Sequence, residues 1–253
     1  MSEQETGKWI PADDAAGIEL RWAVRAGDVE AIRRLLRADP ALATARLVGR
    51  GGGTGTPLHL VTDWPGYFPN GPRIVRILTD AGADPNALTT SRGTETGPGS
   101  ETPLHYAASS DDADVAEALI DAGADTEVPN GSIGTPLDNA IGYGCWHVAR
   151  LLVTRGARVD KAWYAAALGM LVRLEELLGS DPPAEEVSQA FWHACAGGQR
   201  RAAEYLLSRG ADLNWEPDYA HGTPLDAASG PTTRQENVTT WLRELGARSA
   251  GSD

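Results

Sequence analysis

One short motif recurs along the 253-residue chain at a fixed interval. Thr-Pro-Leu occurs at Thr56, Thr102, Thr135 and Thr223. The step from Thr102 to Thr135 is 33 residues, and Gly123 and Gly156, which follow the next apolar stretches, are also 33 residues apart. A fixed period of this length indicates supersecondary units, each of which buries its apolar face only by stacking on its neighbours. The chain is therefore predicted to be a stacked array of small repeats.

Each residue type in the motif has a structural reason. Threonine caps a helix N-terminus through its hydroxyl, and proline in the first turn loses no hydrogen bond because its position has no intrahelical partner. An apolar-periodic stretch such as RIVRILTDAGADPN then ends at a glycine, here Gly82, where a positive φ stops the helix. Each repeat is therefore predicted to be two helices followed by a projecting finger loop.

The motif and its period together resemble the ankyrin-repeat family. The best copies are TPLHLVTD (56–63), TPLHYAAS (102–109), TPLDNAIG (135–142) and TPLDAASG (223–230), and weaker copies span 18–37, 163–178 and 188–207. The resemblance implies an all-α ankyrin-repeat solenoid of about seven helix-turn-helix repeats with projecting finger loops, of which the two central repeats are degenerate. It covers residues 17–248, between an N-terminal extension (1–16) and a C-terminal tail (249–253). It also implies that His59 and His105 hydrogen-bond to the backbone of a neighbouring finger.

Composition argues against several classes of function. The chain has 22 Lys and Arg against 35 Asp and Glu, a net charge of -13 that repels nucleic acid and anionic lipid surfaces. No secretory signal or apolar stretch of about 18 residues is visible, so a cytoplasmic protein is expected. Cys145 and Cys195 are too few for a disulfide framework or a cysteine-based zinc site, and no nucleotide-binding or metalloprotease motif occurs. We therefore predict neither a metal nor a cofactor.

Three segments depart from the repeat pattern and are candidates for function. Residues 63–73, DWPGYFPNGPR, project aromatic side chains either as a contact surface or as a local cluster that folds the loop back. The finger 87–101 is rich in Gly, Ser and Thr, which predicts mobility, with or without ordering by a ligand. The finger 214–222 is either a binding finger or a filler loop. The candidate residues in the first and third segments are Asp63, Trp64, Tyr67, Phe68, Trp215, Tyr219 and His221.

Tryptophan and tyrosine are unusually abundant, with eight Trp and six Tyr against two Phe. Both residue types are enriched at recognition surfaces. Trp22 lies in a terminal repeat, where it is expected to shield the end of the array. Trp163 and Trp192 lie on the first helices of the degenerate repeats, where they are predicted to form a pocket facing Tyr143 and Trp215 if trimmed fingers leave it open.

Two functions remain open on the sequence alone. The first is a non-enzymatic recognition module that binds a protein or peptide through its concave face and the aromatic insertion. The second is a small-molecule-binding protein or unusual enzyme, with an aromatic-lined pocket and Asp138, His193, His221 or Asp226 as acid-base groups. The sequence does not decide whether chemistry is catalysed, nor does it give the oligomeric state.

Overall fold

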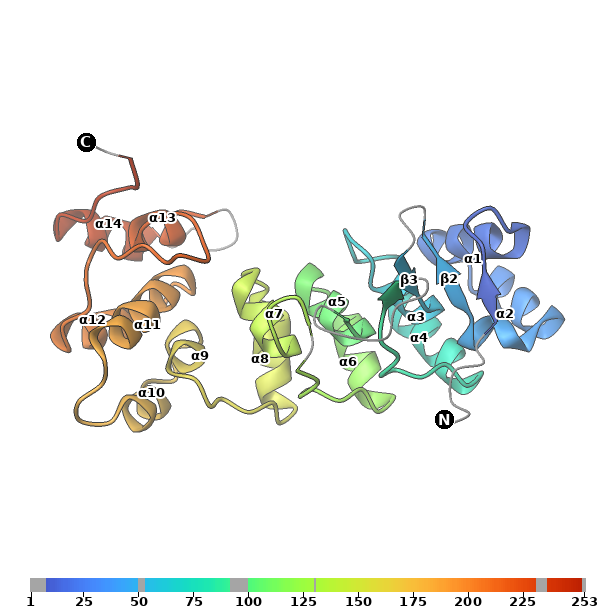
Figure 1. The fold of residues 1–253 in the computed structure, drawn as a ribbon, viewed down its shortest axis with the longest axis horizontal. Coiled ribbons are helices and arrows are strands. Elements are labelled where there is room, and N and C mark those ends of the chain that lie inside the picture. Colours follow the sequence, from blue (N-terminus) through green and yellow to red (C-terminus); the bar gives the residue numbers. More distant parts are fainter. Residues whose placement is uncertain (1–7, 50–52, 92–99, 130, 231–235, 252–253) are drawn as a thin grey trace. The chain divides into compact units, whose positions relative to one another are not determined.

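The fold consists of short helices joined by turns and finger loops (Figure 1). The computed structural model describes residues 8–49, 53–91, 100–129, 131–230 and 236–251. The chain divides into two compact units, Met1–Ala157 and Arg158–Asp253, and this division falls inside the predicted domain 17–248. No helix within the described ranges is long and apolar enough to cross a membrane.

The N-terminal unit is built of helix pairs stacked in two rows (Figure 1). Its helices are α1 (Ala15–Ala26), α2 (Val29–Ala38), η1 (Pro40–Thr44), α3 (Pro57–Val61), α4 (Gly71–Asp80), α5 (Pro103–Ser110), α6 (Ala113–Asp121), α7 (Pro136–Gly142) and α8 (Trp146–Thr154). The first helices α1, α3, α5 and α7 contact one another in sequence order, and the second helices α2, α4, α6 and α8 do the same. Small and branched apolar residues fill the space between the rows, among them Leu58, Leu104 and Ala108, all fully buried.

The C-terminal unit follows the same plan. Its helices are α9 (Ala162–Ala167), α10 (Leu171–Leu178), α11 (Ala184–Ala196), α12 (Arg200–Ser208), α13 (Pro224–Ala228) and α14 (Glu236–Glu244). The residues predicted as two degenerate repeats form the helix pairs α9–α10 and α11–α12. Helix α11 contacts α9 on one side and α13 on the other, and its Phe191 is fully buried in the core of the unit.

A small sheet also lies in the N-terminal unit, which the sequence analysis did not predict. It has the order β1 (Trp9–Ile10), β2 (Arg46–Val48), β3 (Gly53–Gly55) and β4 (Thr90–Ser91), with β1 parallel to β2 and the other pairs antiparallel. The sheet joins the N-terminal extension to segments between helices and buries Ile10 and Leu47. Strands of two or three residues carry too little alternation to be recognised from a sequence.

The finger predicted over residues 87–101 is closed at its base. The Thr89 amide donates to the Glu101 carbonyl at 2.8 Å, and the Glu101 amide donates to Thr89 Oγ1 at 2.9 Å. Residues 92–99, on which the prediction of mobility mainly rests, lie outside the described residues. The paired base nevertheless fixes the backbone of Glu101.

Each Thr-Pro-Leu motif forms a reciprocal helix cap. In α5 the Thr102 hydroxyl accepts from the His105 amide, while His105 Nδ1 accepts from the Thr102 amide at 3.2 Å. Because Nδ1 accepts a backbone N–H, Nε2 carries the proton, and it donates to the Gly134 carbonyl at 3.0 Å. His59 makes the same bonds to Thr56 and to the Glu101 carbonyl, also at 3.0 Å. The predicted structural role of both histidines is confirmed.

The helix ends and the cysteines also agree with the sequence analysis. Gly82 and Gly123 follow α4 and α6 with φ of +95°, a conformation that glycine adopts without strain. Cys145 and Cys195 are free and buried, and burial raises the pKa of both thiols.

Replacement of His105 by Ala is expected to destabilise the chain by about 3 kcal/mol. The change leaves the Thr102 amide without its acceptor, which costs about 1–3 kcal/mol, and removes one of the two hydrogen bonds to the Gly134 carbonyl, which still accepts from the Gly131 amide at 2.8 Å. Urea unfolding followed by circular dichroism measures the loss. The control is His147→Ala, which removes an exposed ring whose Nδ1 lies 2.7 Å from Asp111 Oδ2, and which should cost less than about 1 kcal/mol. Equal losses in the two variants would contradict the capping role.

Stability should fall as the pH drops below neutrality. Burial lowers the pKa of His59 from 6.5 to about 4, and burial also lowers the pKa of His105. Between these values the unfolded chain binds more protons than the folded one, so the stabilisation is complete above pH 6.5 and is lost as the pH falls toward 4. Each such histidine contributes a slope of up to about 1.4 kcal/mol per pH unit.

Urea unfolding at a series of pH values between about 5 and 7 tests this slope. His59→Asp introduces the residue type that completes the helix caps at Asp138 and Asp226. A helix cap therefore remains, while the imidazole that titrates in this pH range is removed. The slope should be smaller in this variant. An unchanged slope would show that His59 does not titrate as its burial requires.

Candidate functional site

The exposed side of the first helices in the N-terminal unit carries large aromatic side chains. Trp22 on α1 is 71% exposed, Trp64 after α3 is 78% exposed, and Tyr143 after α7 is 49% exposed. These positions lie on or directly after helices that stack in one row, and they belong to the first, second and fourth helix pairs of the unit. Two hollows occupy this surface, and we name them the arginine hollow and the glutamate hollow.

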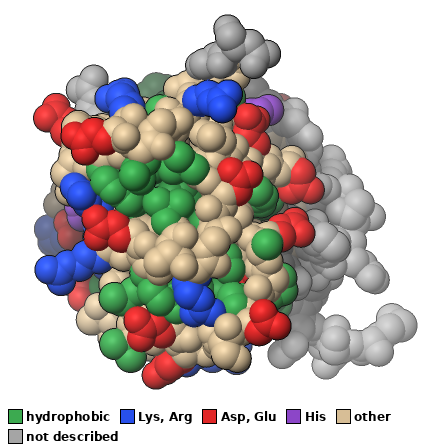
Figure 2. Space-filling model, turned by 90° about the vertical axis from the view of Figure 1, so that its left-hand side faces the viewer, with side chains coloured by type: hydrophobic (Ala, Val, Ile, Leu, Met, Phe, Trp, Pro, Cys, Tyr) green, Lys and Arg blue, Asp and Glu red, His purple; other side chains and the backbone are tan. Residues whose placement is uncertain are grey.

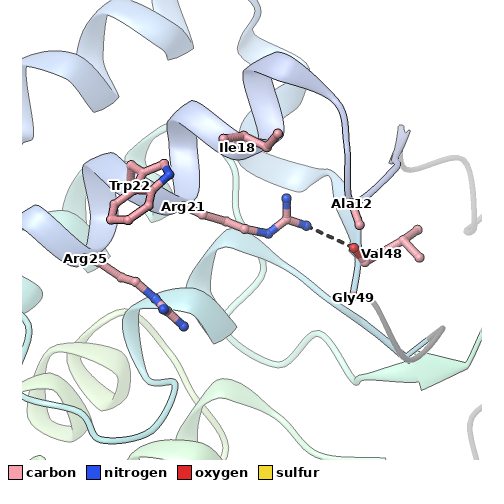
Figure 3. A pocket seen from close by; sticks show the side chains of 7 residues that line it. All are labelled: Ala12, Ile18, Arg21, Trp22, Arg25, Val48 and Gly49. Carbon is pink, nitrogen blue, oxygen red and sulfur yellow. Dashed lines mark hydrogen bonds between the residues drawn. The ribbon is translucent and has the colours of Figure 1, made fainter.

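The arginine hollow lies beside α1 (Figure 3). It has a volume of about 530 Å³ and is lined by Ala12, Ile18, Arg21, Trp22, Arg25, Val48 and Gly49. The Arg21 guanidinium extends across it and donates from Nη2 to the Val48 carbonyl at 3.0 Å. Its Nη1 is buried with no partner within the described part of the chain, and burial lowers the pKa of this guanidinium against the opposing effect of Asp14.

The glutamate hollow is smaller and more polar. It has a volume of about 200 Å³ and is lined by Thr62, Asp63, Trp64, Glu101, Tyr106, Ser109, Ser110, Ser132 and Tyr143. It therefore combines two carboxylates, three hydroxyl-bearing serines and three aromatic rings. Arg25 of the first hollow forms an ion pair with Asp63 of the second at 3.1 Å, so the two hollows adjoin. Both partners of this pair are well exposed, and such a pair adds little stability.

The aromatic insertion at 63–73 is anchored by polar contacts while two of its rings stay exposed. The Tyr67 amide donates to Asp112 Oδ2 at 2.7 Å, and Asn70 Nδ2 donates to the Gly27 carbonyl at 2.9 Å. Trp64 and Tyr67 are nevertheless 78% and 65% exposed, whereas Phe68 is half-buried. Both alternatives from the sequence thus apply in part, because the loop folds back and still presents aromatic surface.

The remaining aromatic candidates gather in the C-terminal unit. The ring of buried His193 lies 4.6 Å from that of Trp163 and stacks on that of Tyr219 at 6.2 Å, measured between centroids. Its Nε2 is 3.1 Å from the Tyr219 hydroxyl, and Trp192 Nε1 donates to the Gly222 carbonyl at 3.0 Å. Trp163 and Trp192 are half-buried in this cluster, and the buried His193 Nδ1 has no hydrogen-bond partner among the described residues.

Trp215 and Tyr219 line a third hollow of about 250 Å³. Its other residues are Pro183, Glu185, Glu186, Gln189 and Asp218. The finger 214–222 is thus part of a surface hollow, in which Gln189 Nε2 donates to the Tyr219 hydroxyl at 3.2 Å. Tyr143, predicted to face this region, lines the glutamate hollow of the N-terminal unit.

Figure 2 shows further apolar patches on another face, interrupted by acidic and basic side chains.

The four acid-base candidates do not gather at one site. Asp138 and Asp226 act as helix-cap residues, where their Oδ2 atoms accept from the amides of Thr135 and Thr223 at 2.7 and 3.0 Å. Burial lowers the pKa of His193 to about 3, which leaves the ring uncharged at neutral pH. His221 is exposed. Within the described ranges, no group of three His, Cys, Asp or Glu residues is placed to hold a metal ion.

Several residues of this surface carry no signal in the sequence that singles them out. Arg21, Arg25, Glu101 and Tyr106 line the two hollows without having been singled out, and Trp22 was assigned only to end shielding. A signal did exist for Tyr106, which follows the histidine of its motif at a position that is free to vary between repeats. Asn139 occupies the same position of the next motif and contacts Glu101.

Comparisons with known proteins agree on one family. Residues 66–163 match the model for ankyrin repeats in three copies. An ankyrin repeat and KH domain-containing protein of Caenorhabditis briggsae is 31% identical over 158 residues, which are 58% of this chain and 6% of that protein. The B-cell lymphoma 3 protein homolog of Mus musculus is 27% identical over 179 residues, which are 69% of this chain and 32% of that protein. The chain thus spans less than a third of either curated relative.

A solved structure extends the similarity over most of the chain. The crystal structure of the ankyrin repeat domain of Bcl-3, described as a unique member of the IkappaB protein family, aligns with a TM-score of 0.50 and 25% identity. The alignment covers 89% of this chain and 97% of that one. The number of repeats and the degenerate character of two of them stay predictions. With the reciprocal caps and the stacked helix pairs, these matches show that residues 66–163 are ankyrin repeats and that the chain is similar in fold to an ankyrin repeat domain.

Proposed function

We propose that the chain is a non-enzymatic recognition module that binds a protein or peptide partner. The partner lies along the exposed side of the first helices in the N-terminal unit, across the arginine and glutamate hollows. The observation that carries this proposal is the set of exposed aromatic residues, Trp22, Trp64 and Tyr143, on the first, second and fourth helix pairs of one stacked row. A cytoplasmic location is part of the same proposal and rests on the sequence.

Residue types and rigidity support this function. Tryptophan, tyrosine and arginine dominate the energetically important positions of protein interfaces, and all three types line the two hollows. These side chains project from helices or from a loop anchored to its neighbours, so little conformational entropy is lost when a partner binds. The adjoining hollows accommodate side chains of an extended segment better than one compact ligand.

The alternative of an enzyme has less support. A general base needs a pKa near the working pH, and burial lowers that of His193 to about 3. Asp138 and Asp226 accept hydrogen bonds from the helix caps that they complete. The hollow beside Trp215 and Tyr219 supports at most a second binding site, and the acid-base candidates do not converge on it.

Peptides selected from a random 12-residue display library should depend on the exposed tryptophans. We expect the double variant Trp22→Ala/Trp64→Ala to weaken binding of the selected peptides by at least about tenfold, because aromatic anchors are removed from a preformed surface. Fluorescence anisotropy with labelled peptides measures this change. The control is Val172→Ala in the C-terminal unit, which is 71% exposed and should bind as the wild type does.

The thermal melting curve of each variant confirms that it is folded. If selected peptides bind the folded double variant as tightly as the wild type, the surface of the first helices is not the recognition site.

A further inference from the structure

We propose that the glutamate hollow binds the cationic side chain of a lysine or arginine in the partner segment. The inference rests on the proposed function and adds the chemistry of the partner. The hollow lies entirely within the N-terminal unit, between α3, α5 and α7 and the finger that precedes α7. Its residues supply a fixed negative charge and aromatic walls, which are the two features that bind an ammonium or guanidinium group.

Uncharged hydrogen-bond donors hold the Glu101 carboxylate in position. Glu101 Oε1 accepts from the Ser132 amide at 3.0 Å, from Ser132 Oγ at 2.9 Å and from Asn139 Nδ2 at 2.8 Å. Asn139 is fully buried, which holds its amide group in place. Within the described part of the chain Glu101 forms no ion pair. Its charge is therefore oriented by hydrogen bonds, and no cation among the described residues neutralises it.

The aromatic walls differ in exposure. Tyr106 is half-buried, and its ring meets that of His59 edge to face with centroids 5.2 Å apart. Trp64 and Tyr143 are 78% and 49% exposed, and the Tyr143 hydroxyl lies 3.4 Å from Ser132 Oγ. Ring faces attract cations, and they also cover the apolar stem of a lysine or arginine side chain. An uncharged apolar side chain would pack on these rings but would have no electrostatic attraction to Glu101.

Charge in the hollow distinguishes a cation from other occupants. Burial raises the pKa of Tyr106, and the carboxylates of Glu101 and Asp63 raise it further, so the phenol stays uncharged between them. Asp63 forms an ion pair with Arg25, whereas Glu101 pairs with no cation among the described residues. A volume of about 200 Å³ is below the range of about 300–1,000 Å³ typical of small-molecule sites, so it suits one side chain better than a whole ligand.

The adjoining arginine hollow limits where positive charge is accepted. Arg21 and Arg25 line it, and a second cation placed there would be repelled. The partner segment therefore carries an isolated basic residue beside neutral or acidic ones. This pattern also fixes the direction and register of the segment on the surface.

Nine-residue Gly-Ser peptides with a central lysine, arginine or norleucine provide a direct test. Nitrogen-15 NMR follows the indole Nε1–H signal of Trp64, which the Trp64→Phe variant assigns. We expect the lysine and arginine peptides to shift this signal saturably and norleucine to bind at least about tenfold more weakly, because it keeps the apolar stem without the charge. Equal binding of norleucine would overturn the inference.

The charge of Glu101 is tested by Glu101→Gln, which keeps an Oε1 acceptor for Ser132 and Asn139. The dissociation constant of the lysine peptide should rise at least about tenfold, with little change in melting temperature. The matched control is Glu186→Gln, which removes a carboxylate from the hollow of the C-terminal unit and should leave binding unchanged. Unchanged affinity in folded Glu101→Gln would overturn the inference. If this variant fails to fold, Tyr143→Leu replaces it, because that change removes an aromatic wall with only one 3.4 Å contact.

The outcomes separate the inference from the proposed function. Display-selected peptides that need Trp22 and Trp64, but lack a basic residue and ignore Glu101→Gln, would refute the inference and leave the proposed function standing. Selected peptides that ignore the tryptophans would refute the proposed function. If free n-butylammonium binds as tightly as the lysine peptide, the occupant of the hollow is a small cation and not a side chain of a peptide.

Discussion

The hydrogen bond from a motif histidine to the next finger is the interaction on which the N-terminal unit depends. His59 caps α3 through Nδ1 and reaches the carbonyl of Glu101 through Nε2 at 3.0 Å, across 42 residues of sequence. One ring thus caps a helix end, whose Thr56 amide it accepts from, and ties the helix to the backbone of the next finger. Because Nδ1 must accept and Nε2 must donate, the bond requires a neutral ring, which its burial enforces.

The same bond positions the candidate site. The Glu101 carbonyl accepts from His59 and from the Thr89 amide, so its backbone is held on two sides. The Glu101 side chain is then held by Ser132, in the next finger, and by Asn139, on the next first helix. His105 fixes that next finger in turn through the Gly134 carbonyl. The repeat architecture therefore sets the place of the carboxylate, and an ordinary structural contact acquires a functional consequence.

The sequence predicts the features that have local sequence patterns and misses those that depend on contacts between distant segments. The helices and their caps were predictable because a 33-residue period and the Thr-Pro-Leu motif are local patterns. Glu101 was not, since it ends a polar finger without periodicity and its partners Ser132 and Asn139 are 31 and 38 residues away. The short strands were missed for the same reason, because their pairing is set by contacts between fingers. The sequence left open whether Trp64 and Tyr67 are exposed or folded back, because prolines and glycines on either side predict a loop but not the direction of its side chains.

The aromatic residues serve two purposes that composition alone does not separate. In the C-terminal unit Trp192 donates to a finger carbonyl and Trp163 lies against a buried, uncharged His193, so these rings stabilise the fold. In the N-terminal unit Trp22 and Trp64 project beside charged groups of both signs, Arg25 and Asp63, which pair with each other. A net charge of -13 attracts basic partners from a distance, but such attraction is unselective. Selectivity requires one site that attracts a cation and a neighbouring site that repels it. The glutamate hollow attracts a cation and the arginine hollow repels one.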